Sequence, residues 1–258
     1  MTADAPPYHW HNRGGPAQML VLCDHASNAV PASHGNLGLA GEQLDLHIAW
    51  DIGAATVARH LADRFDAPAI MAGYSRLVID CNRHPDDPAS IATVSDGVSI
   101  AANQGLSPGE TELRRERFFR PYHDEIRATL DDFIAAARPP VLLSVHSFTP
   151  VFNGARRPWH IGICWLADDR MAPSVMSQLR ADGSINVGDN MPYALDPAED
   201  YTLIEHGLRR GLPHVLVEFS QDLVADPSGA RHWADRLARA VEQALENDAV
   251  RQVRHYWP

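Results

Sequence analysis

Short apolar runs alternate along the chain with longer segments in which apolar residues recur every three or four positions. Such runs are typical of buried strands, and the longer repeats are typical of amphipathic helices. The predicted strands cover residues 19–23, 76–80, 141–145, 159–166 and 214–219. The predicted helices cover about 51–65, 113–137, 172–180, 199–210 and a closing stretch of 233–245, and Pro121 should kink the second helix or mark its start.

This alternation predicts one α/β domain over residues 18–250, preceded by a flexible N-terminal segment, 1–17. We expect a twisted, mainly parallel mixed sheet with helices on both faces. One long segment, 84–112, is rich in Pro, Asp, Ser, Ala and Gly and has little periodicity. Irregular segments longer than about 15 residues are commonly lids or binding loops. We therefore expect 84–112 to cover the substrate and exclude water.

The composition narrows the function classes. The chain has 258 residues, with 33 acidic and 22 basic side chains and a formal charge of −11, which disfavours nucleic acid and anionic membranes as partners. Every basic residue is arginine, so lysine Schiff bases and the Walker A lysine are excluded. No signal peptide or apolar run of about 18 residues is visible, which predicts a cytoplasmic protein.

Residues suited to catalysis follow or end three of the predicted strands. His25 follows 19–23, His146 follows 141–145, and Glu218 lies near the end of 214–219. The carboxyl ends of parallel strands meet at one edge of a sheet, where α/β proteins form their sites. Each of these residues alone is more often structural, but together they favour a catalytic zinc site, which needs three N or O ligands, an open position and a base.

A second group of polar residues lies in the segment SRLVIDCNR. It contains Arg76, Asp80, Asn82 and Arg83. An arginine beside an asparagine can hold a carboxylate through two parallel hydrogen bonds. The alternative is a structural ion pair between an arginine and Asp80.

Seven segments resemble the N-formylglutamate amidohydrolase family, in the family's order and over about residues 20–223. They are CDHASNAVP, HIAWDIGA, YSRLVIDCNR, FFRPYHDEI, SVHSF, RRPWHIGI and LPHVLVEFSQ. The family is similar to zinc carboxypeptidases and aspartoacylase-type amidohydrolases. The resemblance therefore implies a zinc-carboxypeptidase-like (phosphorylase/hydrolase-like) fold and one Zn²⁺ ion per chain.

The resemblance also implies roles for individual residues. His25 and His146 match the first and last zinc ligands of those relatives, and Glu218 matches their general base. The substrate carboxylate would be bound by Arg83 with help from Asn82 and Arg76, and more weakly by Arg157 of the RRPW segment.

The middle zinc ligand departs from the relatives' pattern. They place a glutamate three residues after the first histidine, whereas this chain has Asn28 there, and an amide is a poor zinc ligand. We predict that Asp51, at the start of the predicted helix, supplies the carboxylate instead. Asp24 is the second choice.

The function implied is hydrolysis of an N-formyl (N-acyl) amino acid such as N-formyl-L-glutamate to formate and the amino acid, a step of histidine catabolism. The substrate is thus a small molecule. Three alternatives stay open: a zinc metallopeptidase or deacylase acting on another N-acyl amino acid or small peptide, a non-catalytic carboxylate-binding relative, and a metal-independent hydrolase with Cys23 or Cys81 as nucleophile.

Overall fold

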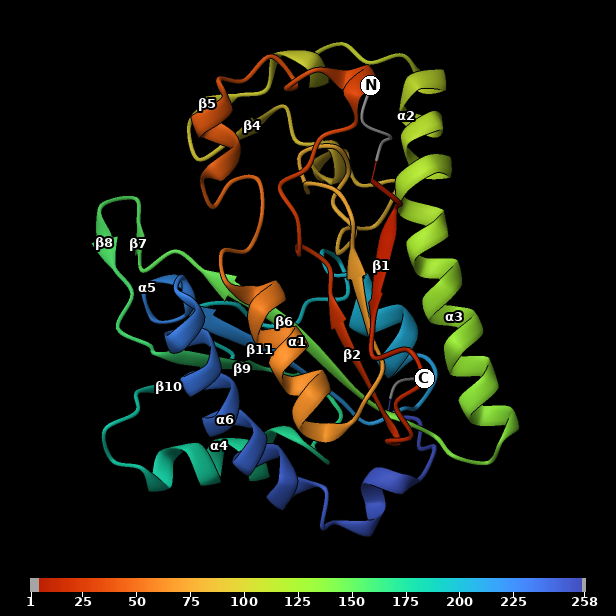
Figure 1. Cartoon of the computed structure of the whole chain (residues 1–258), viewed down its shortest axis with the longest axis vertical. Coiled ribbons are helices and arrows are strands. Elements are labelled where there is room, and N and C mark those ends of the chain that lie inside the picture. The colour runs from red at the N-terminus through yellow and green to blue at the C-terminus, as the bar shows by residue number, and fades with distance from the viewer. Residues whose placement is uncertain (1–4, 257–258) are drawn as a thin grey trace.

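A seven-stranded sheet forms the centre of the molecule in a computed structural model that describes residues 5–256 (Figure 1). Its strands, in spatial order, are β1 (Tyr8–His11), β3 (Ala69–Ala72), β2 (Met19–Cys23), β6 (Val141–Phe148), β11 (His214–Ser220), β9 (Ile161–Cys164) and β10 (Val187–Asp189). Strand β2 is parallel to β3 and β6, β11 to β6, and β10 to β9. The pairs β1–β3 and β9–β11 are antiparallel, so the predicted mixed, mainly parallel sheet is confirmed.

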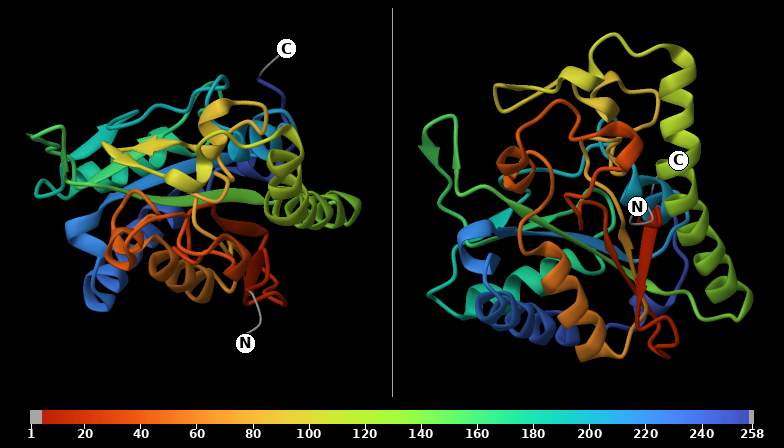
Figure 2. Two further views of the ribbon diagram at one scale, coloured as in Figure 1. Left: turned by 90° about the horizontal axis from the view of Figure 1, so that it is seen from above. Right: turned by 45° about the horizontal axis from the view of Figure 1, so that its top comes forward.

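Helices cover both faces of this sheet (Figure 2). One face carries α1 (Ala54–Phe65), α4 (Ala172–Ala181) and α6 (Pro227–Ala244), and the other carries α3 (Arg120–Ala135). Neighbouring strand residues alternate between the two cores: Val21 packs with the first set of helices, and Leu20 and Leu22 pack with α3. Both faces are therefore buried, which explains why the central strands read as unbroken apolar runs.

The remaining elements are short. The helical turns are η1 (Ala32–His34), η2 (Gly41–Asp45), η3 (Pro88–Ile91), η4 (Ala101–Asn103), α5 (Gln221–Val224) and η7 (Asp248–Arg251). Two hairpins are made by β4 (Val94–Ser95) with β5 (Val98–Ser99) and by β7 (Val151–Phe152) with β8 (Ala155–Arg156). Within residues 5–256 no helix is both long and apolar enough to cross a bilayer.

The helix predicted at 113–137 is longer and contains a wide turn. It consists of α2 (Pro108–Arg114), the π-helical turn η5 (Arg115–Phe119) and α3. Pro121 lies in the first turn of α3, where a missing backbone N–H costs least, so it marks the start of α3 as predicted.

Two predicted segments have a different structure. The apolar run 76–80 is buried but is not a strand, because the neighbouring backbone N–H groups donate to loop carbonyls: Ser75 to Ala29, Arg76 to Ala49 and Asp80 to Ser90. The strand in its place is β3, whose sequence AIMA is short. The helix predicted at 199–210 is much shorter in the structure. Residues 202–203 are helical, and the π-helical turn η6 (Ile204–Leu208) follows them.

The segments predicted to be irregular are more ordered than expected. Within 1–17, residues Tyr8–His11 form the edge strand β1, while 1–4 lie outside the described residues. The segment 84–112 contains η3, β4, β5, η4 and part of α2, and it buries Ile91 and Ile100 in a third apolar cluster with Leu77 and Phe118. It is thus a packed part of the fold.

A buried histidine pair should make the protein sensitive to acid. His123 Nε2 bonds the Cys81 carbonyl and its Nδ1 bonds His206 Nε2 at 3.0 Å, so the two rings share one proton and cannot both be charged. Burial lowers the pKa of His123 to about 4, against an ordinary value of 6.5. The unfolded chain therefore takes up protons first, and His123 should remove about 3 kcal/mol of the free energy of unfolding as the pH falls from 6.5 to 4.

Urea denaturation between pH 4 and 7 tests this expectation. The stability of a His123→Gln variant should depend less steeply on pH than that of the parent, even if the variant is less stable throughout. His232→Gln, at an exposed position on α6, is the matched control and should keep the parent's slope. An unchanged slope in His123→Gln would show that other groups cause the acid sensitivity.

Candidate active site

One cavity of about 180 Å³ lies at the carboxyl ends of β2, β6 and β11. His25 follows β2 by two residues, His146 lies near the end of β6, and Glu218 lies near the end of β11. Glu218 is paired in register with His146 on the neighbouring parallel strand, so the two side chains are on the same face of the sheet. The structure thus brings together the three residues that the strand pattern selected.

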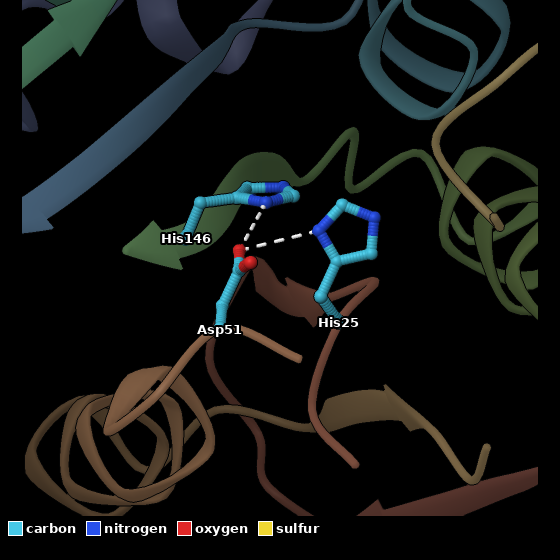
Figure 3. A group of neighbouring side chains, drawn as sticks. All are labelled: His25, Asp51 and His146. Carbon is cyan, nitrogen blue, oxygen red and sulfur yellow. Dashed lines mark hydrogen bonds and ion pairs between the residues drawn. The ribbon is translucent and has the colours of Figure 1, made fainter. Parts of the chain in front are cut away.

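Asp51 joins the two histidines (Figure 3). Its Oδ2 atom is 3.2 Å from His25 Nδ1 and 2.9 Å from His146 Nδ1. These donor atoms lie within 4.8 Å of one another, and all three residues are buried. The backbone N–H of Asp51 donates to the carbonyl of His25 at 3.0 Å, which holds the turn before α1 against the end of β2. This bond explains how a carboxylate 26 positions away reaches His25.

The turn that carries Asp51 depends on a glycine. Helix α1 begins at Ala54, so Asp51 precedes it, and Gly53 between them has a φ of +83°. A Cβ atom on Gly53 would lie 2.2 Å from the carbonyl oxygen of Val224. Only glycine fits this conformation and this close approach.

A second layer of carboxylates fixes the imidazole rings. His25 Nε2 is 2.7 Å from Asp80 Oδ1, and His146 Nε2 is 3.2 Å from Asp24 Oδ2. An ionised carboxylate only accepts hydrogen bonds, so each Nε2 carries a proton, and in the neutral rings the Nδ1 lone pairs face the centre. Asp24 therefore contacts the outer side of His146 and is not part of the central group. Asn28 donates to the Leu44 carbonyl instead.

The carboxylates around the two histidines carry an excess of negative charge, which a cation would balance. Asp24, Asp51 and Asp80 carry three negative charges, and Arg76, 2.6 Å from Asp80, compensates one of them, which leaves two. Burial alone would lower the pKa of His146, but the hydrogen bonds that its ring donates to the carboxylates of Asp24 and Asp51 outweigh burial, so the net shift of the pKa is well upward. Two imidazolium ions or one divalent cation would balance the cluster. Two nitrogens and one carboxylate oxygen, with an open side toward the cavity, form a donor set that fits zinc.

Glu218 has the environment of a proton acceptor. It is 7% exposed and lines the cavity, and its buried Oε2 atom has no hydrogen-bond partner in the part of the chain that the structure describes. Burial raises the pKa of Glu218 to about 8, because a carboxylate is poorly solvated there. A carboxyl group with a free oxygen and a raised pKa can exchange a proton near neutral pH.

The predicted carboxylate-binding residues differ in what they contact. Arg76 and Arg83 both line the cavity. Arg76 bonds Asp80 and lies 3.6 Å from Asp51 Oδ1, so it neutralises the carboxylates beside the two histidines. Arg83 Nη1 is 2.8 Å from Glu199 Oε2, at the solvent-accessible side.

The other two predicted substrate contacts have different positions. Asn82 lines the cavity, and its amide also holds the chain near Arg83: its Nδ2 donates to Asp200, and its Oδ1 accepts from the backbone of Thr202. Arg157 is not among the cavity-lining residues, because its guanidinium stacks on the rings of Phe152, Tyr193 and Phe148 at 4.7–5.8 Å.

The cavity wall contains residues that sequence reasoning missed. They are His47, Ser147, Cys164, Tyr193, Ala194, Leu195, Glu199, Asp200, Leu216 and Gln221. Half of them come from the segment 193–200. No residue of 84–112 lines the cavity, so the segment that we expected to cover the substrate is not part of the cavity wall. The acidic run DPAED (196–200) was the feature of the sequence that could have pointed to the segment 193–200.

The cysteines do not have the properties of nucleophiles. Cys23 and Cys81 are buried, and burial raises the pKa of both thiols well above the ordinary value. A thiolate is the reactive form of cysteine, and it is disfavoured at both positions. The geometry therefore favours metal chemistry over thiol chemistry.

Comparisons with known proteins give a consistent picture. The profile of the family "N-formylglutamate amidohydrolase" matches residues 17–225. The chain is 31% identical over 110 residues to an N-formylglutamate deformylase from Pseudomonas putida; the match covers 37% of this chain but only 41% of that protein. Among solved structures, gene product Atu2144 from Agrobacterium tumefaciens is 33% identical, with a TM-score of 0.91 and coverage of 94% of this chain and 96% of that one. N-formylglutamate amidohydrolase from Ralstonia eutropha shares the fold, at 19% identity, a TM-score of 0.67 and coverage of 93% and 98%.

Proposed function

The chain belongs to the N-formylglutamate amidohydrolase family, and from this premise we propose that it is a zinc-dependent hydrolase of N-formyl amino acids. N-formyl-L-glutamate is the first candidate substrate, which would assign the protein to histidine catabolism in the cytoplasm. One observation carries the proposal: the donor atoms of His25, Asp51 and His146 lie in the same cavity as the carboxyl group of Glu218, whose Oε2 atom has no partner among residues 5–256.

His25 Nδ1, His146 Nδ1 and Asp51 Oδ2 would hold the zinc ion. When bound, zinc polarises the amide carbonyl and lowers the pKa of a water molecule. Glu218 accepts the proton from the attacking water on its free Oε2 atom and then donates it to the nitrogen of the leaving amine. Arg83 holds the carboxylate of the substrate and thereby orients the scissile amide.

A formate-release assay tests the proposal. Purified protein should contain about one zinc ion per chain and release formate from N-formyl-L-glutamate. Removal of the metal by a chelator should abolish formate release, and added zinc should restore it, whereas alkylation of the thiols should not abolish it. Activity that survives complete metal removal would contradict the proposal.

One feature favours a second candidate, a deacylase for N-acyl amino acids with a neutral side chain. Arg76 is tied to buried carboxylates, which leaves Arg83 as the cavity-lining arginine that can exchange its partner. N-formyl-L-glutamate has two carboxylates, and the neighbouring wall includes Leu195 and Leu216. Comparison of N-formyl-L-glutamate with N-formyl-L-methionine and N-acetyl-L-glutamate separates the two candidates.

The carboxylate-binding role of Arg83 makes a specific prediction. Arg83→Lys keeps the positive charge but loses the paired donors of the guanidinium, so the KM for N-formyl-L-glutamate should rise about tenfold to a hundredfold. The zinc content should stay at the parent's value, because Arg83 is not bonded to a metal-binding residue. Unchanged steady-state kinetics would show that the carboxylate is bound elsewhere.

A further inference from the structure

The carboxylate-binding arginine of this cavity already has a carboxylate partner from the chain itself. Arg83 Nη1 and Glu199 Oε2 are 2.8 Å apart, and both residues line the cavity. The side chains are 27% and 62% exposed, so the ion pair is in contact with solvent. Solvent-exposed ion pairs are weak and can exchange partners at little cost.

The backbone around Glu199 is held firmly beside Arg83, although the Glu199 side chain is exposed. Arg83 and Asp200 form an antiparallel bridge, and Asn82 Nδ2 donates to Asp200 Oδ1 at 2.9 Å. The backbone N–H of Thr202 donates to Asn82 Oδ1 at 3.0 Å. The fixed backbone therefore keeps the Glu199 carboxylate within reach of Arg83. A change of side-chain rotamer alone is enough to break the ion pair.

We propose that Glu199 is a specificity-determining residue that occupies Arg83 in the free protein and is displaced by the carboxylate of the ligand. The inference rests on the proposed function, because it takes Arg83 as the carboxylate-binding residue. A ligand without an anionic group cannot form the ion pair that replaces Glu199 on Arg83. A ligand with one exchanges an existing ion pair for a new one, so the number of ion pairs stays the same and salt should weaken binding only slightly.

Titration calorimetry of the zinc-supplemented protein with L-glutamate, over a range of NaCl concentrations, tests this exchange. In Glu199→Gln no carboxylate competes for Arg83, so L-glutamate should bind about two- to fivefold more tightly at low salt. Binding to this variant creates a net ion pair, so its affinity should fall more steeply with salt than the parent's. The matched control is Glu205→Gln, which removes the same charge and an ion pair with Arg209 outside the cavity. It should behave like the parent.

Three results would overturn the inference. They are weaker binding in Glu199→Gln, equal affinity and salt dependence in Glu199→Gln and the parent, and no saturable binding of L-glutamate to either protein. The formate-release assay keeps this question separate from the proposed function. Formate release with no effect of Glu199→Gln on binding would refute the exchange alone. Tighter binding in Glu199→Gln without any formate release would support the exchange and refute the proposed activity.

Discussion

Glu218→Gln is expected to lower kcat by a factor of about 10²–10⁴ while the protein keeps its metal. Glutamine has nearly the same shape as glutamate, but it cannot take a proton from water or return one to the leaving amine. Within residues 5–256, Glu218 makes no hydrogen bond through Oε2, and it is not one of the three residues proposed to bind the metal, so the proposed metal site should survive the change.

Steady-state kinetics with N-formyl-L-glutamate and zinc analysis of the same samples measure this effect. In the parent, kcat/KM should rise with pH as Glu218 loses its proton, with an apparent pKa at or below about 8, since a nearby cation favours the charged carboxylate. That rise should disappear in Glu218→Gln. Glu205→Gln, the same chemical change outside the cavity, should keep full activity. Loss of zinc from Glu218→Gln would instead identify Glu218 as a ligand.

The position of the central site could be predicted because it follows from strand burial. The strands β2, β6 and β11 are buried throughout and mostly apolar, and a charged or ionisable residue near the end of such a strand stands out. Parallel pairing then brings His25, His146 and Glu218 to one edge of the sheet. Asp51 lies in a turn and could only be proposed as a replacement for the missing glutamate of the relatives.

The carboxylates behind the histidines could not be assigned from spacing. Asp24 and Asp80 were visible beside His25 and Arg83, but sequence does not show which ring nitrogen a carboxylate faces. That depends on the path of the chain after each strand. Tyr122 of α3 and Thr202 also donate to Asp24, at 2.8 and 2.9 Å, which fixes its carboxylate on the outer side of His146. These contacts join residues about 100 and 180 positions apart.

The segment that forms much of the cavity wall could not be predicted, because its sequence has no regular pattern of apolar and polar residues. Residues 193–200 contain no helix or strand, and their position depends on long-range bonds such as that from Cys164 Sγ to the Tyr193 carbonyl. The segment 84–112 looked equally irregular, but its buried apolar residues tie it to a separate cluster. Composition alone does not distinguish a segment that lines a cavity from one that packs elsewhere.

The second large effect expected is loss of the metal when a residue of the central group is removed. His146→Ala deletes one of the two facing Nδ1 atoms and leaves Asp24 and Asp51 without their shared partner, so zinc and activity should fall together. Asp51→Asn keeps the size of the side chain but removes the charge. Because Asp51 Oδ2 faces both rings, this change should lower zinc affinity by more than the 10- to 100-fold typical of residues behind the ligands.

Asn28→Ala is the control that distinguishes the two possible third ligands. Asn28 occupies the position of the relatives' glutamate but bonds the Leu44 carbonyl and Asp45, so its replacement should leave zinc affinity unchanged. Competition with a chromogenic zinc chelator gives the affinities of the variants on one scale. If Asp51→Asn holds zinc as tightly as Asn28→Ala and stays active, Asp51 is not a ligand. Its carboxylate would then serve to stabilise the positive N-terminal end of α1.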